Sequence, residues 1–504
     1  MSNLRDKFNR LDDDLIEMIL GSLSLSEKFR YECLSKRLQR LIFNKHYELK
    51  IDSHFGYLRP MFKLEFSIGT YGPYYRINVR VFHKMLVKLK SIEAIVIKGN
   101  IVIDSNFLKT VALKCPRLRR LEFGANVEAD KLTQESIERF GMYCGKNLHT
   151  LKFSEKFKAK TTIQFLSQTP DLRKLYITNL EGMLTYKSEK FQLRNLKKLR
   201  SLTFHASVMD ELTDAREWLN VEHVLIDAYI HTILAEAKFT ANQLLQSYKL
   251  VNLNSLVINF TYLSREDITS IYQGFKQFPT TCRLLKSLSI RMHAVFKPSP
   301  NLINFMELFG QIRYLENLVF VITGYFGNVE SYNYGNIQDL KGLRYLRNLD
   351  LQLIYLHDRN FENIHIMLPN LKSVEIVTEN YISDKALISL VLAKNLVSVN
   401  IFSYTRSREV RFTDSGLIHL IRHAPNLRSV KLNGNQSNIF NITSRTIREF
   451  KLKAQRNEKF QFKLQLYNGL WSDVFERKYG RSARFQAEFP AAVDELPRNL
   501  TMTF

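Results

Sequence analysis

One spacing of apolar residues recurs along most of the chain. The phrase apolar-x-x-apolar-x-apolar occurs thirteen times, and successive phrases start 22 to 32 residues apart, about 28 on average. The phrases start at Ile92, Leu118, Leu148, Leu172, Leu199, Val221, Leu253, Leu285, Leu315, Leu346, Leu371, Leu396 and Leu427. The second and third apolar residues lie two apart, so they share one face of a short strand. The phrase therefore predicts a strand in every repeat.

Between the strands the apolar residues change to helical spacing. In the clearest unit Thr413 is placed to cap a helix, Leu417, Leu420 and Ile421 fall on one face, and Pro425 ends it. A single strand of this kind cannot bury its apolar face alone. We therefore expect stacked repeats whose strands form a parallel sheet over one continuous core.

The repeating unit resembles the leucine-rich repeat, in the cysteine-containing class that is common in F-box proteins, and Cys115 and Cys144 keep the cysteine of that class. The resemblance implies an α/β fold, a curved solenoid with a parallel sheet on the concave face and helices on the convex face. We expect about 13 repeats over residues 92–435. Residues 49–91 are interpreted as a linker, an N-terminal cap or a degenerate first repeat, and residues 436–504 as a C-terminal cap and tail.

The N-terminal segment has a different pattern. Leu15, Ile16, Ile19, Leu20 and Leu23 fall on one face of a predicted helix, and Ser24 to Glu27 has the spacing of a capping box. A module of about forty residues buries little core, so we expect it to be stabilised by docking on a partner.

Residues 11 to 41 align without a gap to the F-box motif. Leu11, Asp13 and Asp14 match its opening, and Ser35, Lys36 and Arg37 match its closing phrase. Asp12 stands where the motif has proline, and Leu38 where it has tryptophan. The resemblance implies an F-box-like, all-helical module at residues 8–48 that binds a Skp-type adaptor. The expected adaptor contacts are Leu11, Leu15, Ile16, Ile19, Leu23, Leu25, Phe29, Leu34, Leu38 and Leu41. The alternative is a helical cap that only covers the first repeat.

Composition narrows the classes of function. The chain has 504 residues and a formal charge of +24, while its first 50 residues hold ten Lys or Arg and eight Asp or Glu, so the excess charge belongs to the repeats. Its four cysteines form no CxxC pair, and no sequence motif of a catalytic, nucleotide-binding or metal site occurs. We therefore expect no catalysis, metal or cofactor, no membrane span, and a place in the cytosol or nucleus.

The positive charge suggests where a target binds. Lys98, Arg120, Lys152 and Lys174 occupy outward positions of four successive predicted strands, and we expect them to form a patch that binds an acidic or phosphorylated segment. Basic residues also recur directly after the first apolar residue, and stacking should align them into a rail along one sheet edge. Its members are Arg119, Arg173, Arg200, Lys286, Arg347, Lys372 and Arg428. The alternative for each is a solvated surface cation.

Together these features are typical of an F-box/leucine-rich-repeat protein. The resemblance implies a non-catalytic substrate receptor of a Skp–cullin–F-box ubiquitin ligase, which holds a target protein for ubiquitination and proteasomal degradation. Its partners would be the Skp-type adaptor, the cullin scaffold and the target. One alternative is a leucine-rich-repeat scaffold whose F-box has decayed. A nucleic-acid binder is a further alternative, but the concave positions lack interleaved basic and aromatic residues.

Overall fold

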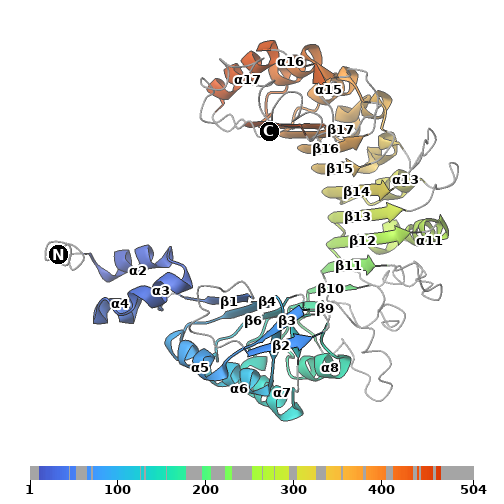
Figure 1. The fold of residues 1–504 in the computed structure, drawn as a ribbon. Coiled ribbons are helices and arrows are strands. Elements are labelled where there is room, and N and C mark those ends of the chain that lie inside the picture. The colour runs from blue at the N-terminus through green and yellow to red at the C-terminus, as the bar shows by residue number, and fades with distance from the viewer. Residues whose placement is uncertain are drawn as a thin grey trace. The chain divides into compact units, whose positions relative to one another are not determined.

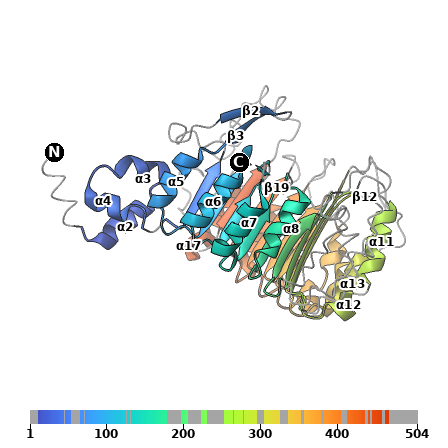
Figure 2. The same cartoon turned by 90° about the horizontal axis from the view of Figure 1, so that it is seen from below.

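The structure is a computed structural model of the whole chain, shown in Figures 1 and 2. It divides into two compact units, Met1–Leu225 and Ile226–Phe504, and each is described by itself. The structure describes residues 11–44, 46–52, 65–69, 72–124, 126–129, 132–154, 156–177, 196–205, 222–229, 252–263, 265–276, 278–294, 304–324, 336–352, 356–378, 382–403, 412–434, 440–441, 444–457 and 461–466.

The first unit begins with three short helices and continues as alternating strands and helices. The helices of the opening module are α2 (Asp13–Gly21), α3 (Leu25–Tyr31) and α4 (Lys36–Leu41). The strands that follow are β1 (Glu48–Asp52), β2 (Glu65–Gly69), β3 (Gly72–Arg76), β4 (Ala94–Lys98), β5 (Ile101–Ile103), β6 (Arg120–Phe123), β7 (Glu128–Ala129), β8 (Thr150–Phe153), β9 (Lys174–Ile177) and β10 (Ser201–His205). The helices between them are α5 (Val79–Lys88), α6 (Ser105–Lys114), α7 (Gln134–Phe140), its π-helical extension η2 (Gly141–Gly145) and α8 (Ala159–Ser167).

The main sheet of this unit is parallel, in the order β1-β4-β6-β8-β9-β10. Ile95, Leu121, Leu151 and Leu175 stand in one row across four strands and are fully buried, as the repeated phrase predicts. Figure 2 shows α5, α6, α7 and α8 side by side along the sheet. A smaller sheet, β2-β3-β5-β7, starts with the antiparallel pair β2 and β3 and is parallel from β3 onward.

The second unit repeats the arrangement with longer strands; β11 (His223–Tyr229) contains the point where the chain passes from one unit to the next. Its strands are β12 (Ser255–Leu263), β13 (Ser287–Ala294), β14 (Asn317–Gly324), β15 (Asn348–Gln352), β16 (Ser373–Thr378), β17 (Ser398–Ser403), β18 (Phe412–Thr413), β19 (Ser429–Gly434), β20 (Phe440–Asn441) and β21 (Gln461–Leu466). Its helices are α11 (Arg265–Phe275), α12 (Phe278–Thr281), α13 (Phe305–Gly310), η7 (Ile337–Gly342), η8 (Asp358–Phe361), α14 (Ile364–Met367), α15 (Asp384–Val391), α16 (Asp414–His423) and α17 (Ser444–Arg456).

The sheet of the second unit is parallel, in the order β12-β13-β14-β15-β16-β17-β19-β21, and β18 pairs with β20 beside it. Leu318, Leu349 and Val374 form part of one buried row on neighbouring strands. Phe320 of β14 packs against Phe305 of the preceding helix α13 at a centroid distance of 5.2 Å. The predicted mixed α/β repeat with parallel strands is therefore present in both units.

Polar side chains join one repeat to the next at the helix N-termini. The Asp358 carboxylate accepts hydrogen bonds from Ser383 N at 2.7 Å and Ser383 Oγ at 2.6 Å. The Asp384 carboxylate accepts in the same way from Thr413 N at 2.9 Å and from the Thr413 hydroxyl. Ser383 and Thr413 are themselves the N-caps of α15 and α16, which confirms the helix start predicted at Thr413. Each cap thus fixes both its own helix and its neighbour.

The parallel strands extend beyond the repeat boundaries that the sequence indicated. The sheet already includes β1, paired with β4 from Glu48, so a first repeat strand precedes residue 92. At the other end β21, which follows α17, pairs with β19 as far as Leu466. Neither end strand carries the full apolar phrase; β1 is the strand that a degenerate first repeat would supply, and β21 lies within the predicted C-terminal cap, so the domain boundaries stay predictions. The predicted tail after residue 466 and the predicted module residues 8–10 lie outside the described residues.

Candidate protein-docking surfaces

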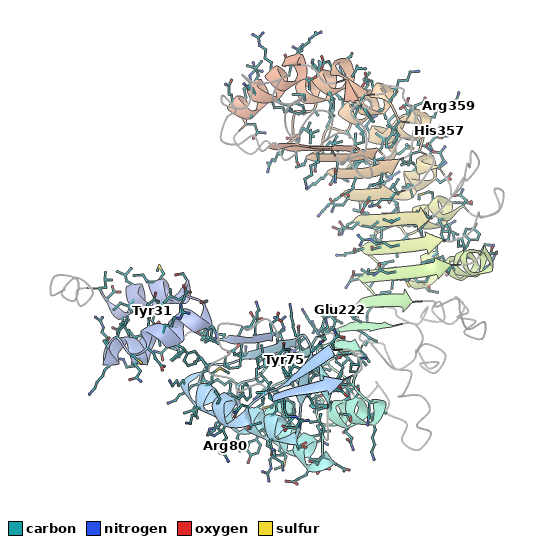
Figure 3. All side chains as sticks on the ribbon, in the orientation of Figure 1. Tyr31, Tyr75, Arg80, Glu222, His357 and Arg359 are labelled. Atoms are coloured by element: carbon teal, nitrogen blue, oxygen red, sulfur yellow. The ribbon has the colours of Figure 1, made fainter. Side chains whose placement is uncertain are left out.

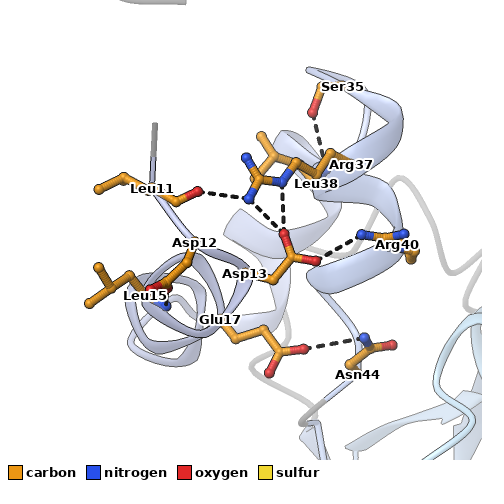
Figure 4. Close-up of polar contacts among 10 residues, drawn as sticks. All are labelled: Leu11, Asp12, Asp13, Leu15, Glu17, Ser35, Arg37, Leu38, Arg40 and Asn44. Atoms are coloured by element: carbon orange, nitrogen blue, oxygen red, sulfur yellow. Dashed lines mark hydrogen bonds and ion pairs between the residues drawn. The ribbon is translucent and has the colours of Figure 1, made fainter. Parts of the chain in front are cut away.

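The first helix of the N-terminal module is fixed by Asp12 and Asp13 (Figure 4). The Asp12 carboxylate accepts a hydrogen bond from Leu15 N at 2.7 Å and caps α2. Arg37 donates from Nε to Asp13 Oδ1 at 2.8 Å, and Arg40 lies 2.8 Å from Asp13 Oδ2. The hydrogen bond from Arg37 is the main reason that the pKa of Asp13 lies below its usual value. The aspartate that stands in place of the motif's proline therefore has a capping role of its own.

The other two helices start at serine caps. The Ser24 N–H donates to Glu27 Oε2 at 2.8 Å, and Glu27 N donates to Ser24 Oγ, so the predicted capping box is confirmed. Ser35 Oγ accepts from Leu38 N at 3.0 Å at the start of α4. The bond from Arg37 to the Leu11 carbonyl joins α4 to the segment that precedes α2, 26 residues away in the sequence.

The apolar face of α2 is divided between the inside and the outside of the module. Ile16 and Leu20 are buried, and Leu41 of α4 is buried as well. On the outside, the exposed fraction is 44% for Leu15, 72% for Met18, 46% for Ile19 and 61% for Leu34. The module therefore has a small closed core and a separate apolar surface.

This division corrects the list of expected adaptor contacts. Ile16 and Leu41 lie in the core of the module rather than on its surface, where α2 and α4 pack together. Leu15, Ile19 and Leu34 are exposed, and the remaining expected contacts are half-buried: Leu11, Leu23, Leu25, Phe29 and Leu38. The sequence interpretation missed Met18 and Tyr31, which is also exposed (Figure 3). Met18 lies one helical turn from Leu15, so helical spacing could have found it.

The module rests on the start of the repeats through polar and aromatic contacts. Lys88 of α5 forms an ion pair with Glu32 at 2.5 Å, and its Nζ lies over the ring of Phe29, 5.4 Å from the centroid. Within the module the rings of Phe29 and Phe43 are 4.8 Å apart. Lys28 lies 3.4 Å from His46 Nδ1. Burial, with a smaller effect of Lys28, lowers the pKa of His46 to about 4, so its ring is neutral at pH 7.

The four basic residues proposed for target binding lie on adjacent strands β4, β6, β8 and β9, on the face opposite the buried rows. They do not share one row. Arg120 stands level with Thr150 and Lys174, whereas Lys152 is level with Glu122 and Lys98 lies farther along. At about 3.3 Å per residue, Lys98 is roughly 13 Å along the strands from the Arg120 row.

Arg120 is also partly neutralised by carboxylates. Its Nε lies 2.6 Å from Glu122 Oε1, and its guanidinium is 3.4 Å from Glu48 of β1. These two contacts, led by the hydrogen bond to Glu122, raise the pKa of Arg120. Among the described ion pairs, none involves Lys98, Lys152 or Lys174. The sequence could not anticipate Glu48, because β1 lies 72 residues away.

The predicted rail along the sheet edge is confirmed as a structural feature. Arg119 N donates to the Glu93 carbonyl at 2.7 Å, His149 N to Arg119 at 2.7 Å, and Arg173 N to His149 at 2.8 Å. The same pattern joins Lys286, Glu316, Arg347 and Lys372 in the second unit. Glu93 and Glu316 stand within the rail and form ion pairs with their basic neighbours.

One acidic pair stands on the open face of the second sheet. Asp350 of β15 and Glu375 of β16 are direct partners across the two strands. Burial raises the pKa of Asp350 to about 6, and the like charge of Glu375 adds to the shift, while Arg291 opposes it. Asp350 Oδ1 is buried without a hydrogen-bond partner.

The described residues include no group of three His, Cys, Asp or Glu side chains that could hold a metal ion. Within the same residues no helix is long and apolar enough to cross a membrane. The four cysteines are free, and burial raises the thiol pKa values of Cys115 and Cys144 to about 12.

No family model matches the chain, and no curated protein matches it. Among solved structures it is similar to a leucine-rich-repeat protein of Leptospira interrogans, at 13% identity and a TM-score of 0.34, over 74% of this chain and 90% of that one. It is also similar to the Rad7 and Elc1 complex of yeast, at 15% identity and a TM-score of 0.38, over 78% of this chain and 84% of that one. Such distant likenesses say nothing of what this chain binds. Its mixed α/β architecture with parallel sheets follows from its own strands and helices.

Proposed function

We propose that this chain is the non-catalytic substrate receptor of a Skp–cullin–F-box ubiquitin ligase. Helices α2 to α4 would bind a Skp-type adaptor, which links the chain to the cullin scaffold, and the repeats would hold a target protein. The observation that carries the proposal is the exposed apolar surface of the module, made by Leu15, Met18, Ile19 and Leu34.

The exposed surface favours docking over a simple helical cap. A cap would turn its apolar side chains toward the first repeat, as terminal repeats do. Here Lys88 of α5 contacts Glu32 and Phe29 of the module, while Leu15 and Ile19 are exposed. Covering each such side chain would contribute up to about 1.5 to 3 kcal/mol, so several together can drive a stable contact.

The proposed mechanism is proximity. The chain supplies no reacting group of its own; it holds the target beside the conjugating enzyme that the scaffold recruits. A lysine of the target then meets the activated ubiquitin at a high effective concentration. The consequence for the target is ubiquitination followed by proteasomal degradation. The four free thiols agree with a place in the cytosol or nucleus, where we propose that the protein acts.

Replacing Ile19 by Asp tests the adaptor contact. The substitution places a charge within the apolar surface, and we expect binding of purified Skp-type adaptor to fall by at least about a hundredfold in a calorimetric titration. Leu113→Asp is the matched control. Leu113 has a similar exposed fraction, 53% against 46% for Ile19, but lies on α6 outside the module. We expect the control to bind as the wild-type chain does.

Two outcomes would contradict the proposal. If the wild-type chain fails to bind adaptor, the chain is better described as a repeat scaffold with a decayed F-box. If Ile19→Asp and Leu113→Asp weaken binding equally, the contact is not made by the module.

We further propose that the target carries an acidic or phosphorylated segment. Lys98, Lys152 and Lys174 provide cations without described carboxylate partners, beside Arg120. The double change Arg120→Glu and Lys152→Glu should weaken capture of a phosphorylated target, and half-molar salt should do the same. If the target is still captured under both conditions, the target-binding site lies in the later repeats instead.

A further inference from the structure

A second exposed surface lies in the second unit, where three successive repeats enter their strands with the same phrase. The phrases are Arg283-Leu284-Leu285, Arg313-Tyr314-Leu315 and Arg344-Tyr345-Leu346. The third residue of each is buried, whereas the second is exposed by 49% in Leu284, 52% in Tyr314 and 54% in Tyr345. We call the three arginines and the three exposed apolar residues the Arg-Tyr stripe.

In neighbouring repeats the residue directly before the first apolar residue makes a structural hydrogen bond. Asn370, Asn395 and Asn426 stand directly before the first apolar residue of their repeats. Their side-chain amides donate to the carbonyls of Arg344, Pro369 and Lys394 in the preceding repeats, each at 2.8 to 2.9 Å. Asn147 makes the equivalent bond to Pro116 in the first unit.

Leucine and tyrosine in the Arg-Tyr stripe cannot donate this amide bond. Their apolar surfaces do not enter the core either, because Leu285, Leu315 and Leu346 already fill it. About half of each of these three side chains stays exposed after folding, which leaves apolar surface that a partner can cover.

The main chain holds the stripe in register. Glu316 N donates to the Lys286 carbonyl at 2.7 Å, and Arg347 N donates to the Glu316 carbonyl at 2.8 Å, one residue beyond each buried leucine. The rings of Tyr314 and Tyr345 stack, with centroids 5.8 Å apart and an interplanar angle of 28°. The exposed side chains thus form a continuous ridge across the repeats, with neighbours about 5 Å apart at the strands.

The charge beside this ridge is positive. Arg283, Arg313 and Arg344 are exposed, and none of them takes part in an ion pair among the described residues. In the adjoining part of the rail Glu316 lies 3.9 Å from Lys286 and 3.2 Å from Arg347. Arg283 donates from Nε to the Thr280 carbonyl at 3.1 Å, which leaves its two terminal nitrogens, and the exposed side chains of Arg313 and Arg344, to bind an anion.

We propose that the Arg-Tyr stripe binds an extended acidic segment of a partner protein. Carboxylates of the segment pair with the arginines, and its apolar or aromatic side chains cover Leu284, Tyr314 and Tyr345. A protein segment fits better than a nucleic acid, because each tyrosine ring already has one face covered by the other and offers less surface for a base. The inference rests on the proposed function only in identifying this partner with the target of the receptor.

The test uses the full-length chain and a fluorescein-labelled twelve-residue peptide of alternating Glu and Phe, measured by fluorescence anisotropy. The double change Tyr314→Asn and Tyr345→Asn installs the asparagine that neighbouring repeats use, so the fold is maintained. We expect it to weaken binding at least about tenfold, as loss of aromatic anchors does. Arg313→Glu with Arg344→Glu should weaken binding by a similar factor.

A matched control separates specific binding from general electrostatics. Lys372→Glu with Arg428→Glu changes the net charge by the same amount, but in repeats that carry asparagine before the first apolar residue. We expect this control to change binding less than about twofold. A peptide with Lys in place of Glu should not bind.

Three results would overturn the inference: no binding by the wild-type chain, wild-type affinity in both stripe variants, or equal losses in the stripe and control charge reversals. Stronger binding of twelve-residue poly-U RNA than of the peptide, with loss in Tyr314→Asn/Tyr345→Asn, would assign the stripe to nucleic acid instead.

Adaptor binding is measured separately on the same variants. Ile19→Asp should retain the peptide, so failure of the adaptor contact is not confused with failure of the stripe.

Discussion

Replacing Asp350 by Asn should stabilise the second unit at neutral pH and make its stability less dependent on pH. Burial raises the pKa of Asp350 from 3.8 to about 6 in the folded state, with Glu375 as the second cause. Between these two values the unfolded chain has already lost the proton that the folded chain retains. The free energy of unfolding of the wild-type protein therefore falls as the pH rises from about 4 to 6, and the cost is fully present above pH 6.

The size of the effect follows from the shift. At 1.36 kcal/mol per pKa unit, a change from 3.8 to about 6 corresponds to an upper bound of about 3 kcal/mol. The side chain is only partly buried, so water reduces this cost, and we expect Asp350→Asn to gain about 1 to 2 kcal/mol at pH 8. Below pH 4 the two proteins should differ little.

Urea unfolding followed by far-UV circular dichroism, at pH 4.5 and pH 8, measures this difference. Glu375→Gln is an informative second variant, because it removes the like charge but leaves Asp350 buried; it should give a smaller gain at pH 8. If the stability of Asp350→Asn follows that of the wild type at both pH values, Asp350 is not held in the protonated form by its surroundings.

Three further predictions concern the core and the helical module. Leu349→Asp should lower the free energy of unfolding by several kcal/mol, because this side chain of β15 is buried in the row between β14 and β16. Gln352→Ala should change it by less than about 0.5 kcal/mol, and equal effects of the two changes would refute the strand register. Asp13→Asn should loosen α4 from α2, because Arg37 and Arg40 both lose the carboxylate that they contact. Faster amide hydrogen exchange in α4 would show this, and unchanged exchange would mean that these contacts do not hold the two helices together. The module should lose stability as the pH falls from 6.5 toward 4, because His46 takes up a proton in the unfolded chain at a higher pH than in the folded chain. His46→Phe should remove this pH dependence when the free energy of unfolding is measured over the same pH range.

The sequence alone determined the repeat and its register. The apolar phrase placed Leu121, Leu349 and their equivalents in buried rows, because a period of two fixes which face of a strand is covered. Local signals were equally reliable for helix starts, since the caps at Ser24 and Thr413 depend only on residues nearby in the chain.

Only the tertiary structure decided which part of a wide apolar face is covered. Helical spacing put Ile16 and Ile19 on the same broad face of α2, but the position of the other two helices buries the first and exposes the second. The sequence pattern could not predict the partners of Arg120 or the burial of Asp350 either. Each depends on strands that are distant in sequence and adjacent in space, and the charge of a side chain there is set by whatever the fold places beside it.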